Sequence, residues 1–212
     1  RRCKPEAEIH DSARLDLNEV LDILIPAAKA GKRVVRLHTG DPSVYGAHRE
    51  QMDALKAAGV PFAVCPGVSS FFGAAASLGA EYTLPGVSQT VILTRAAGRT
   101  PVPEKERLST LAAHGASMVL FLSAGRVAEA VSELLAGGYY TKETPAAVVY
   151  KATWPDERIL RTTLGELAKD AEAAGITKTA LLLIGDFLGA AYENSKLYDP
   201  SFTTEFREGK QA

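Results

Sequence analysis

This sequence of 212 residues contains two cysteines, one tryptophan and no long apolar run. Cys3 and Cys65 are too few and too far apart for a disulfide framework or a zinc site. No stretch of about 18 apolar residues occurs, so we expect no membrane span. Residues 1–5 also lack the apolar centre of a signal peptide. Together these absences favour a cytoplasmic protein.

An excess of charge of either sign is also missing. The chain has 24 lysines and arginines against 25 aspartates and glutamates, a formal net charge of −1. This balance argues against nucleic acid or an anionic membrane as the main partner. Apolar residues make up 46% of the chain, which is enough to bury the core of one large domain or two small ones.

The common catalytic signatures are absent as well. The sequence has no G-x-G-x-x-G, G-x-x-x-x-G-K-[ST], H-E-x-x-H, C-x-x-C or G-x-S-x-G pattern. Their absence disfavours dinucleotide-binding dehydrogenases, P-loop NTPases, zinc proteases and the usual serine hydrolases. The four histidines have no metal-ligand spacing, so we expect no metal site.

The chain instead alternates between patterns typical of helices and of strands, which predicts an α/β fold. The expected helices cover residues 16–29, 44–58, 69–79, 104–114, 127–135 and 165–174. The expected strands cover residues 34–37, 62–65, 90–94, 118–122, 146–150, 158–164 and 179–184. Turn formers in 81–88 indicate a linker, and we predict domains at 1–85 and 86–212. A single sheet with all elements in series is the alternative, and the pattern alone does not decide.

Two loops follow neighbouring strands of the first half, where α/β proteins bind ligands. In the first loop, Gly40 lets backbone approach a ligand closely, and Asp41 offers a carboxylate or a helix cap. In the second loop, Ser69 and Ser70 offer hydroxyls at the start of a helix, suited to a polar cofactor group. Ordinary strand–turn–helix connections are the alternative for each loop. We expect the two loops to lie side by side.

Two segments of the second half carry side chains suited to an acidic or flat ligand. Arg95 and Arg99 flank Gly98 and are suited to binding carboxylates through paired N–H groups. Two solvated surface arginines are the alternative. Trp154 is suited to covering a flat ligand, although a place in the core or at an interface fits it equally well.

Six segments occur in an order that resembles the tetrapyrrole (corrin/porphyrin) methylases. They are TGDP (39–42), PGVSS (66–70), SQTVILTRAAGRTPVP (88–103), AVVYKATWPDE (147–157), TKTALLLIGDFL (177–188) and SKLYDPSF (195–202). The first two are shared across the family. The segments TRAAGRTPVP, YKATWPDE and YDPSF are shared less widely and are similar to the subgroup of precorrin-4 and cobalt-precorrin-4 C11-methyltransferases of cobalamin biosynthesis. The resemblance extends from about residue 7 to residue 202.

The resemblance implies two α/β domains with S-adenosylmethionine in a cleft between them and S-adenosylhomocysteine as product. The cofactor-binding residues that it implies are Gly40, Asp41, Val44, Ser69, Ser70, Ser123, Ala152 and Ala180. Arg95 and Arg99 would then bind the carboxylates of a small-molecule tetrapyrrole substrate. The resemblance also implies a homodimer. It assigns no general base, so we name no catalytic residue.

The sequence departs from the family at its start. Members begin with a strand, a glycine- and proline-rich loop and a helix, none of which precedes Arg1. We therefore expect one strand and one helix of the first domain to be missing. Two other hypotheses stay open: a different methylase of the same superfamily, and a truncated module that binds ligand without turnover.

Overall fold

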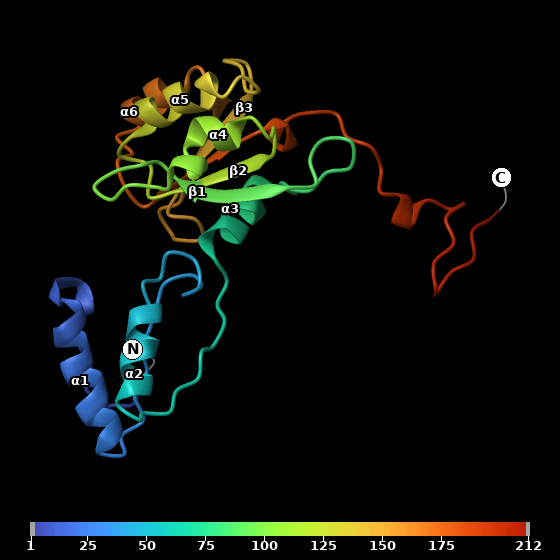
Figure 1. The fold of residues 1–212 in the computed structure, drawn as a ribbon. Helices are drawn as coiled ribbons and strands as arrows, with labels where there is room; N and C mark the ends of the chain where they lie inside the picture. The colour runs from blue at the N-terminus through green and yellow to red at the C-terminus, as the bar shows by residue number, and fades with distance from the viewer. Residues whose placement is uncertain (1–2, 211–212) are drawn as a thin grey trace. The chain divides into compact units, whose positions relative to one another are not determined.

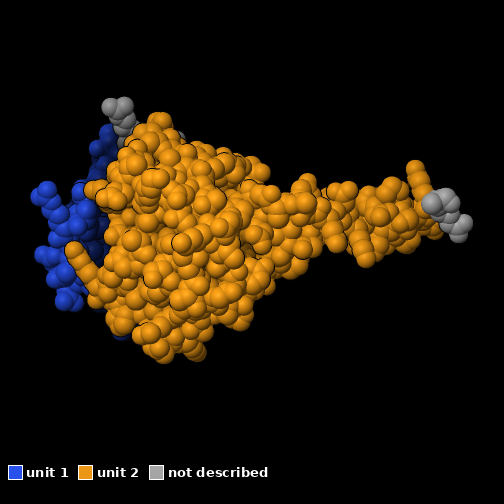
Figure 2. All heavy atoms as spheres, turned by 90° about the horizontal axis from the view of Figure 1, so that it is seen from above, with its two compact units in different colours: residues 1–69 blue, residues 70–212 orange. Residues whose placement is uncertain are grey.

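The computed structural model describes residues 3–210. Contacts divide the chain into two compact units, residues 1–69 and residues 70–212, which we call the N-terminal unit and the sheet unit (Figure 2). The division at residue 85 that the sequence suggested remains a prediction about folding units.

The sheet unit is built on five strands in the order β1-β2-β5-β3-β4. Their bounds are β1 (Val91–Arg95), β2 (Ser117–Phe121), β3 (Pro145–Tyr150), β4 (Arg158–Thr163) and β5 (Ala180–Ile184). Strands β1 and β2 are parallel, whereas β2–β5, β5–β3 and β3–β4 are antiparallel pairs. All five strands were predicted from the sequence to within one or two residues.

Helices cover both faces of this sheet (Figure 1). The helix on one face is α3 (Ser70–Leu78), and those on the other are α4 (Leu108–Ala112), α5 (Val127–Ala136) and α6 (Leu167–Ala173). Side chains of a strand alternate between the two faces, so Met118 and Leu120 join the cluster under α4–α6 while Val119 packs on the side of α3. Each fully buried aliphatic side chain contributes about 1.5–3 kcal/mol. This layered core confirms the predicted α/β class.

The N-terminal unit contains two helices, α1 (Leu17–Lys29) and α2 (Arg49–Ala57). The start of α1 is the predicted capping box. The amide of Glu19 donates to the Asp16 carboxylate at 2.9 Å, and the Asp16 amide donates to the Glu19 carboxylate at 2.8 Å. After the helix, Gly31 has the left-handed φ of 78° that favours glycine.

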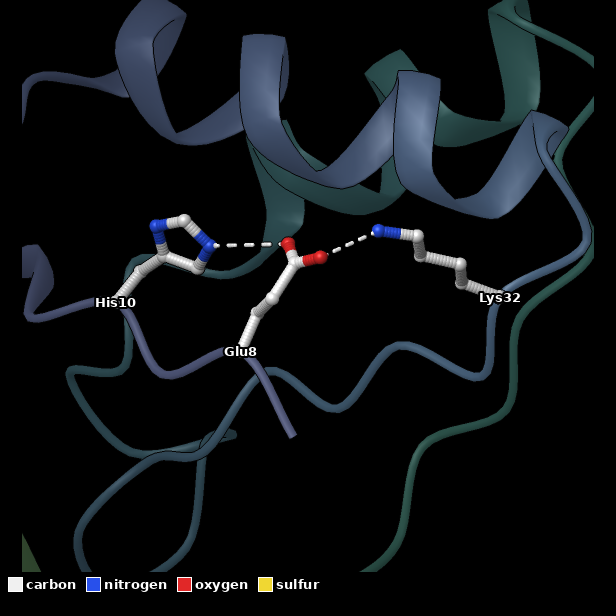
Figure 3. A network of polar contacts seen from close by, with 3 residues as sticks. All are labelled: Glu8, His10 and Lys32. Carbon is white, nitrogen blue, oxygen red and sulfur yellow. Dashed lines mark hydrogen bonds and ion pairs between the residues drawn. The ribbon is translucent and has the colours of Figure 1, made fainter. Parts of the chain in front are cut away.

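A polar network joins the segments before and after α1 (Figure 3). Lys32 Nζ lies 2.6 Å from Glu8 Oε1, and His10 Nε2 lies 3.9 Å from Glu8 Oε2. The hydrogen bond from Lys32 lowers the pKa of Glu8 below its ordinary value. All three side chains are exposed, so the network contributes little to stability.

Two strands expected in the N-terminal unit, 34–37 and 62–65, do not form in the described chain. A strand exists through hydrogen bonds to a neighbouring strand, and no such ladder joins these segments in residues 3–210. Their apolar side chains are correspondingly exposed: Val35 is 77% and Leu37 is 81% exposed. The prediction of strands at these two segments is therefore wrong for the described chain.

Two helices are shorter than predicted. The helix expected over 44–58 begins only at Arg49, because Tyr45 and Ala47 have positive φ values of 55° and 46°, which a right-handed helix excludes. The helix expected over 104–114 is divided at Arg107, whose ψ of 145° is extended. The short 3₁₀ helices are η1 (Ser12–Arg14), η2 (Glu104–Glu106), η3 (Asp186–Leu188) and η4 (Lys196–Tyr198).

The longest helix, α1, has 13 residues. Within residues 3–210, no helix has both the length and the apolar character needed to cross a membrane. This agrees with the expectation drawn from the absence of a long apolar run.

Candidate functional site

The loop after residue 38 is organised by the carboxylate of Asp41. One carboxylate oxygen, Oδ1, accepts hydrogen bonds from the Ser43 amide at 2.9 Å and from the Ser43 hydroxyl, and the other, Oδ2, accepts from the Gly67 amide at 2.7 Å. The Ser43 hydroxyl, followed by the amides of Gly67 and Ser43, lowers the pKa of Asp41. Asp41 is therefore an ionised side chain that joins the two predicted loops.

The two loops also meet backbone to backbone. A Cβ atom at Gly67 would lie 2.0 Å from the carbonyl oxygen of Gly40, so no other residue fits there without movement of the loops. A Cβ atom at Gly46 would lie 2.1 Å from the carbonyl oxygen of Pro42. The predicted side-by-side arrangement of the loops is confirmed; Gly67 is needed for the approach of the two loops, and Gly46 for the turn of the first loop. Val44 lies within the tight turn that Gly46 closes.

The two serines of the second loop differ in exposure. Ser69 is buried and ends the N-terminal unit, whereas Ser70 is exposed and begins α3 in the sheet unit. The predicted start of the helix is thus confirmed. The hydroxyl of Ser70 is accessible at the first turn of this helix.

In the sheet unit, the register brings the remaining predicted residues to one edge of the sheet. The carboxyl ends of β1, β2 and β3 lie at the same edge as the amino end of β5, because β1 and β2 are parallel while β5 is antiparallel to both β2 and β3. Tyr150 pairs with Ala180, and the next amide, of Lys151, donates to the carbonyl oxygen of Thr179 at 2.9 Å. Ala180 therefore lies opposite Tyr150 at this edge, and Ala152 follows two residues after Tyr150.

Ser123 joins two strands at the same edge. Its side chain is fully buried, and its Oγ accepts a hydrogen bond from the Ala96 amide at 2.8 Å and donates to the Phe121 carbonyl at 2.7 Å. This hydroxyl fixes the backbone that follows β1 against the backbone that follows β2. Its hydrogen bonds are thus already made within the protein, so a role in cofactor binding would fall to the backbone beside it.

Strained backbone occurs in the turn that follows Asp41 and at the edge of the sheet just described. Among residues 3–210, six non-glycine residues have positive φ: Tyr45, Ala47, Leu122, Lys151, Thr153 and Thr179. Four of them lie at this edge of the sheet and two lie in the turn that follows Asp41. Such residues cost free energy and cluster at functional sites. Leu122 is also 74% exposed, which is unusual for a leucine directly after a buried strand.

The two arginines have different environments. The Arg95 guanidinium donates to the carbonyl oxygens of Thr100 at 3.1 Å and Pro101 at 2.8 Å, and thereby holds the loop that follows β1. Arg99 is exposed on that loop and has no hydrogen-bonding or ion-pair partner within residues 3–210. The sequence did not indicate that Arg95 is engaged by its own loop.

The turn between β3 and β4 holds further residues that sequence reasoning did not single out. Lys151 pairs with Asp156 at 2.5 Å, and its ammonium lies 5.3 Å from the ring centroid of the half-exposed Trp154. Glu157 accepts hydrogen bonds from this turn and from α3. The hydrogen bond between Ser77 and Glu157 leaves no signature in a single sequence, because the two residues lie 80 positions apart.

Other parts of the described chain give no competing chemistry. No group of three or more His, Cys, Asp or Glu residues in residues 3–210 is placed to hold a metal ion. A pocket of about 460 Å³ lies beside α3 and β1, lined mainly by apolar side chains that include Phe71, Phe72 and Leu93. It lies along the strand face and includes none of the predicted site residues. We therefore place one group of candidate residues in the loops of the N-terminal unit and, separately, another at the edge of the sheet unit.

Comparison with known proteins gives consistent matches. Residues 2–168 match the family described as Tetrapyrrole (Corrin/Porphyrin) Methylases. The cobalt-precorrin-4 C(11)-methyltransferase of Methanocaldococcus jannaschii is 52% identical over 97% of this chain and 79% of its own length.

Solved structures agree with this. A cobalt precorrin-4 methyltransferase of cobalamin biosynthesis has a TM-score of 0.85 and 48% identity, with coverage of 87% of this chain and 77% of the other. A uroporphyrin-III C-methyl transferase from Thermus thermophilus, complexed with S-adenyl homocysteine, has a TM-score of 0.68 and 28% identity, with coverage of 81% and 74%.

Proposed function

Because this chain belongs to the tetrapyrrole (corrin/porphyrin) methylase family, we propose that it transfers a methyl group from S-adenosylmethionine to carbon 11 of precorrin-4 or of its cobalt form. The substrate would be a flat macrocycle with carboxylates around its rim. The product of the cofactor would be S-adenosylhomocysteine. We place this reaction in cobalamin biosynthesis.

One observation carries the proposal. Each of the four segments with strained backbone contains a residue that the family likeness assigns to the cofactor: Val44 precedes Tyr45, Ser123 follows Leu122, Ala152 lies between Lys151 and Thr153, and Ala180 follows Thr179. Strain is retained where the surrounding structure and the function require it. The likeness and the backbone geometry are independent sources of support for the same residues.

The chemistry of these residues fits an adenosyl group. Ala152 and Ala180 have small side chains at the end of the sheet where β3 finishes and β5 begins, and small side chains leave room for a planar base. We assign cofactor binding to them and to Gly40, Asp41, Val44, Ser69, Ser70 and Ser123. When bound, S-adenosylmethionine would supply a sulfonium-activated methyl group, with S-adenosylhomocysteine as the leaving group.

The protein contributes chiefly by positioning. An in-line methyl transfer needs no covalent nucleophile, and correct orientation alone can supply about 7–11 kcal/mol in favourable cases. Positive charge is lost from the sulfur in the transition state, so a site from which water is excluded favours transfer. Asp41 holds the loops through both of its carboxylate oxygens and is not assigned a step in the reaction.

Substrate carboxylates are assigned to Arg95 and Arg99. Arg99 is exposed on the loop after β1 and has its whole guanidinium available. Arg95 holds that loop through the carbonyl oxygens of Thr100 and Pro101, so its contribution includes the conformation of the loop. Paired hydrogen bonds between a guanidinium and a carboxylate are stronger than neutral ones.

The test has a binding part and a turnover part. Calorimetry of this chain with S-adenosylhomocysteine is expected to show one site, and absence of binding at millimolar ligand would contradict the proposal. Incubation with S-adenosylmethionine and precorrin-4 or cobalt-precorrin-4 is expected to add one methyl group at carbon 11, located by NMR with a ¹³C-labelled methyl. A methyl at another carbon indicates a different methylase of the superfamily, and binding without turnover indicates a ligand-binding module.

Arginine variants test substrate binding. Arg99→Ala is expected to raise the KM for the tetrapyrrole about tenfold, because one charge-assisted hydrogen-bonding partner is lost. Arg49→Ala is the matched control, since its guanidinium is exposed and pairs only with Asp53 on the same helix. Equal KM values for the two variants would remove Arg99 from the proposed site.

We also propose that the protein is a cytoplasmic homodimer. The two cysteines of the described chain are free and exposed, which suits a reducing compartment. Sedimentation velocity at micromolar concentration is expected to give the mass of a dimer, and a monomer under these conditions would contradict this part of the proposal.

A further inference from the structure

The turn between β3 and β4 is held in an unusual backbone conformation. Lys151 and Thr153 have φ values of 49° and 68°, and Ala152 lies between them. Neither residue is a glycine, so each left-handed conformation is costly unless neighbouring contacts fix it. The start of the turn is fixed by the hydrogen bond from the Lys151 amide to the Thr179 carbonyl at 2.9 Å.

Glu157 fixes the rest of the turn. A single carboxylate oxygen, Oε2, accepts hydrogen bonds from the Thr153 amide at 2.5 Å and from the Ser77 hydroxyl of α3 at 2.7 Å. These two bonds lower the pKa of Glu157, with the Ser77 hydroxyl as the larger cause. No lysine or arginine within residues 3–210 forms an ion pair with it. Glu157 therefore acts as a hydrogen-bond acceptor that joins the turn to a helix.

Helix α3 is shaped to receive this turn. A Cβ atom at Gly73 would lie 3.1 Å from Thr153 Cγ2 and 3.6 Å from the Cβ of Ala152. Ser77 lies one helical turn after Gly73, and its hydroxyl also lies 3.0 Å from the Gly73 carbonyl. The close approach at Gly73 thus acts on Ala152 and Thr153, while the hydrogen bond from Ser77 acts on Glu157 of the same turn.

We infer that Glu157 is a positioning residue for the cofactor, with Ser77 as its partner. It holds the Thr153 amide, and through it the strained backbone around Ala152, in the conformation that binds the adenosyl group. This inference rests on the proposed function, since it takes Ala152 as a cofactor contact. Glu157 itself has no role in the chemistry of methyl transfer.

The geometry allows variants to distinguish whether Glu157 acts as a hydrogen-bond acceptor or through its negative charge. Because both hydrogen bonds end on one oxygen, Glu157→Gln can keep them through its amide oxygen while losing the charge. Glu157→Asp is shorter by one methylene group and cannot reach both partners. Glu157→Ala loses both bonds.

The test measures cofactor binding, turnover and folding on the full chain. Glu157→Ala is expected to raise the Kd for S-adenosylhomocysteine about tenfold, because the backbone that binds the cofactor is no longer held in place. The value of kcat at saturating S-adenosylmethionine is expected to stay within about twofold of wild type, because Glu157 affects binding of the cofactor and not the transfer step. Glu157→Gln is expected to bind almost as wild type, and Glu157→Asp to bind like Glu157→Ala. Glu172→Ala, an exposed glutamate of α6, is the matched control and is expected to bind as wild type.

Two further readouts identify the connection itself. Hydrogen exchange of residues 151–157 is expected to speed up in Glu157→Ala and in Ser77→Ala, and not in Glu172→Ala. The double variant Ser77→Ala/Glu157→Ala is expected to bind no more weakly than Glu157→Ala alone, because both changes remove one connection. If Glu157→Ala does not fold, Ser77→Ala and Glu157→Gln provide the same comparison.

Each outcome supports or contradicts the positioning role of Glu157. If wild type binds S-adenosylhomocysteine and folded Glu157→Ala binds equally well, the positioning role is overturned and the proposed function stands. Loss of binding in Glu157→Gln equal to that in Glu157→Ala also overturns it, since charge would then be what matters. If wild type itself does not bind, the proposed function falls and the positioning role falls with it.

Discussion

Similar apolar patterns lead to different structures in the two units. Residues 34–37 of the N-terminal unit are as β-branched and apolar as strand β2 of the sheet unit. In β2, Met118, Val119 and Leu120 are completely buried between helices and neighbouring strands. In the N-terminal unit, Leu37 is mostly exposed, and no ladder of hydrogen bonds forms among the described residues. A strand pattern predicts a strand only where a partner strand is supplied.

The loops that carry the candidate residues depend less on partner strands. The turn after residue 40 in the N-terminal unit is held by the carboxylate of Asp41 and by the close approach at Gly67. The corresponding turns of the sheet unit are held by Ser123 and Glu157. In both units a polar side chain bonded to backbone amides fixes the conformation of the candidate site. Loop geometry therefore depends on a few polar contacts, whereas a strand depends on a whole ladder of hydrogen bonds.

The largest expected effect comes from removing core volume. Leu182→Ala, in the central strand β5, is expected to destabilise the sheet unit by about 2–5 kcal/mol, because the side chain is fully buried in the cluster under α4–α6. Leu37→Ala in the N-terminal unit is expected to change stability by no more than about 0.5 kcal/mol. Hydrogen exchange of β2 and of α1 measures each unit separately. A large effect of Leu37→Ala would mean that residues 34–37 are packed in solution.

The second prediction concerns the hydroxyl that joins β1 to β2. Ser123→Ala leaves the buried Ala96 amide without its acceptor, so a loss of about 1–3 kcal/mol is expected in the sheet unit. Ser132→Ala on the exposed side of α5 is the matched control. Urea unfolding followed by the fluorescence of Trp154, the single tryptophan, measures both. Equal midpoints for the two variants would show that the hydrogen bond from Ala96 contributes nothing.

The sequence predicted the sheet unit well because its central strands β2, β3 and β5 are nearly continuous apolar runs bounded by turn residues. Strand β5, for example, is five buried apolar residues between Thr179 and Gly185. It also predicted the capping box at Asp16, since both partners are three residues apart. Such features are local, and a single sequence contains them.

The candidate site was only partly predictable. Gly40, Asp41 and the serines were chosen from loop chemistry, and family likeness added Ser123, Ala152 and Ala180. The positive φ of Leu122 and of Thr179 and the double hydrogen bond to Glu157 could not be foreseen. They arise from segments brought together by the sheet register, and separation in the chain hides them.

The third prediction uses the tyrosines, which are buried only in the sheet unit. Burial raises the pKa of Tyr82 and of Tyr140 above the ordinary value near 10.0, while Tyr45 of the N-terminal unit is half-exposed. Above that value the unfolded chain ionises these groups and the folded chain does not, so folding becomes less favourable as pH rises. The loss approaches about 1.4 kcal/mol per group for each pH unit.

Phenylalanine variants check this directly. Tyr82→Phe and Tyr140→Phe each lose a hydrogen bond, to the carbonyl oxygens of Phe71 and Ala116, and are less stable at neutral pH. Each is nevertheless expected to reduce the fall in stability between pH 10 and 11. Tyr198→Phe, at an exposed position, is expected to leave the fall unchanged. An unchanged slope in the two buried variants would assign the alkaline loss to other groups.

The smallest expected effect concerns the pKa of Asp41. Its measurement tests whether the loops of the N-terminal unit keep their geometry in solution without a sheet. The Ser43 hydroxyl and the amides of Gly67 and Ser43 stabilise the carboxylate, so its NMR midpoint should lie below the ordinary value near 3.8. The connection to Gly67 is complete at neutral pH and is lost as pH falls through that lowered pKa, and the Gly67 amide shift should follow the same curve. Ser43→Ala should raise the midpoint toward 3.8, whereas Ser12→Ala should not move it. A Gly67 amide that does not sense the titration would mean that this connection is absent, and that the loop, like residues 34–37, needs support from outside the unit.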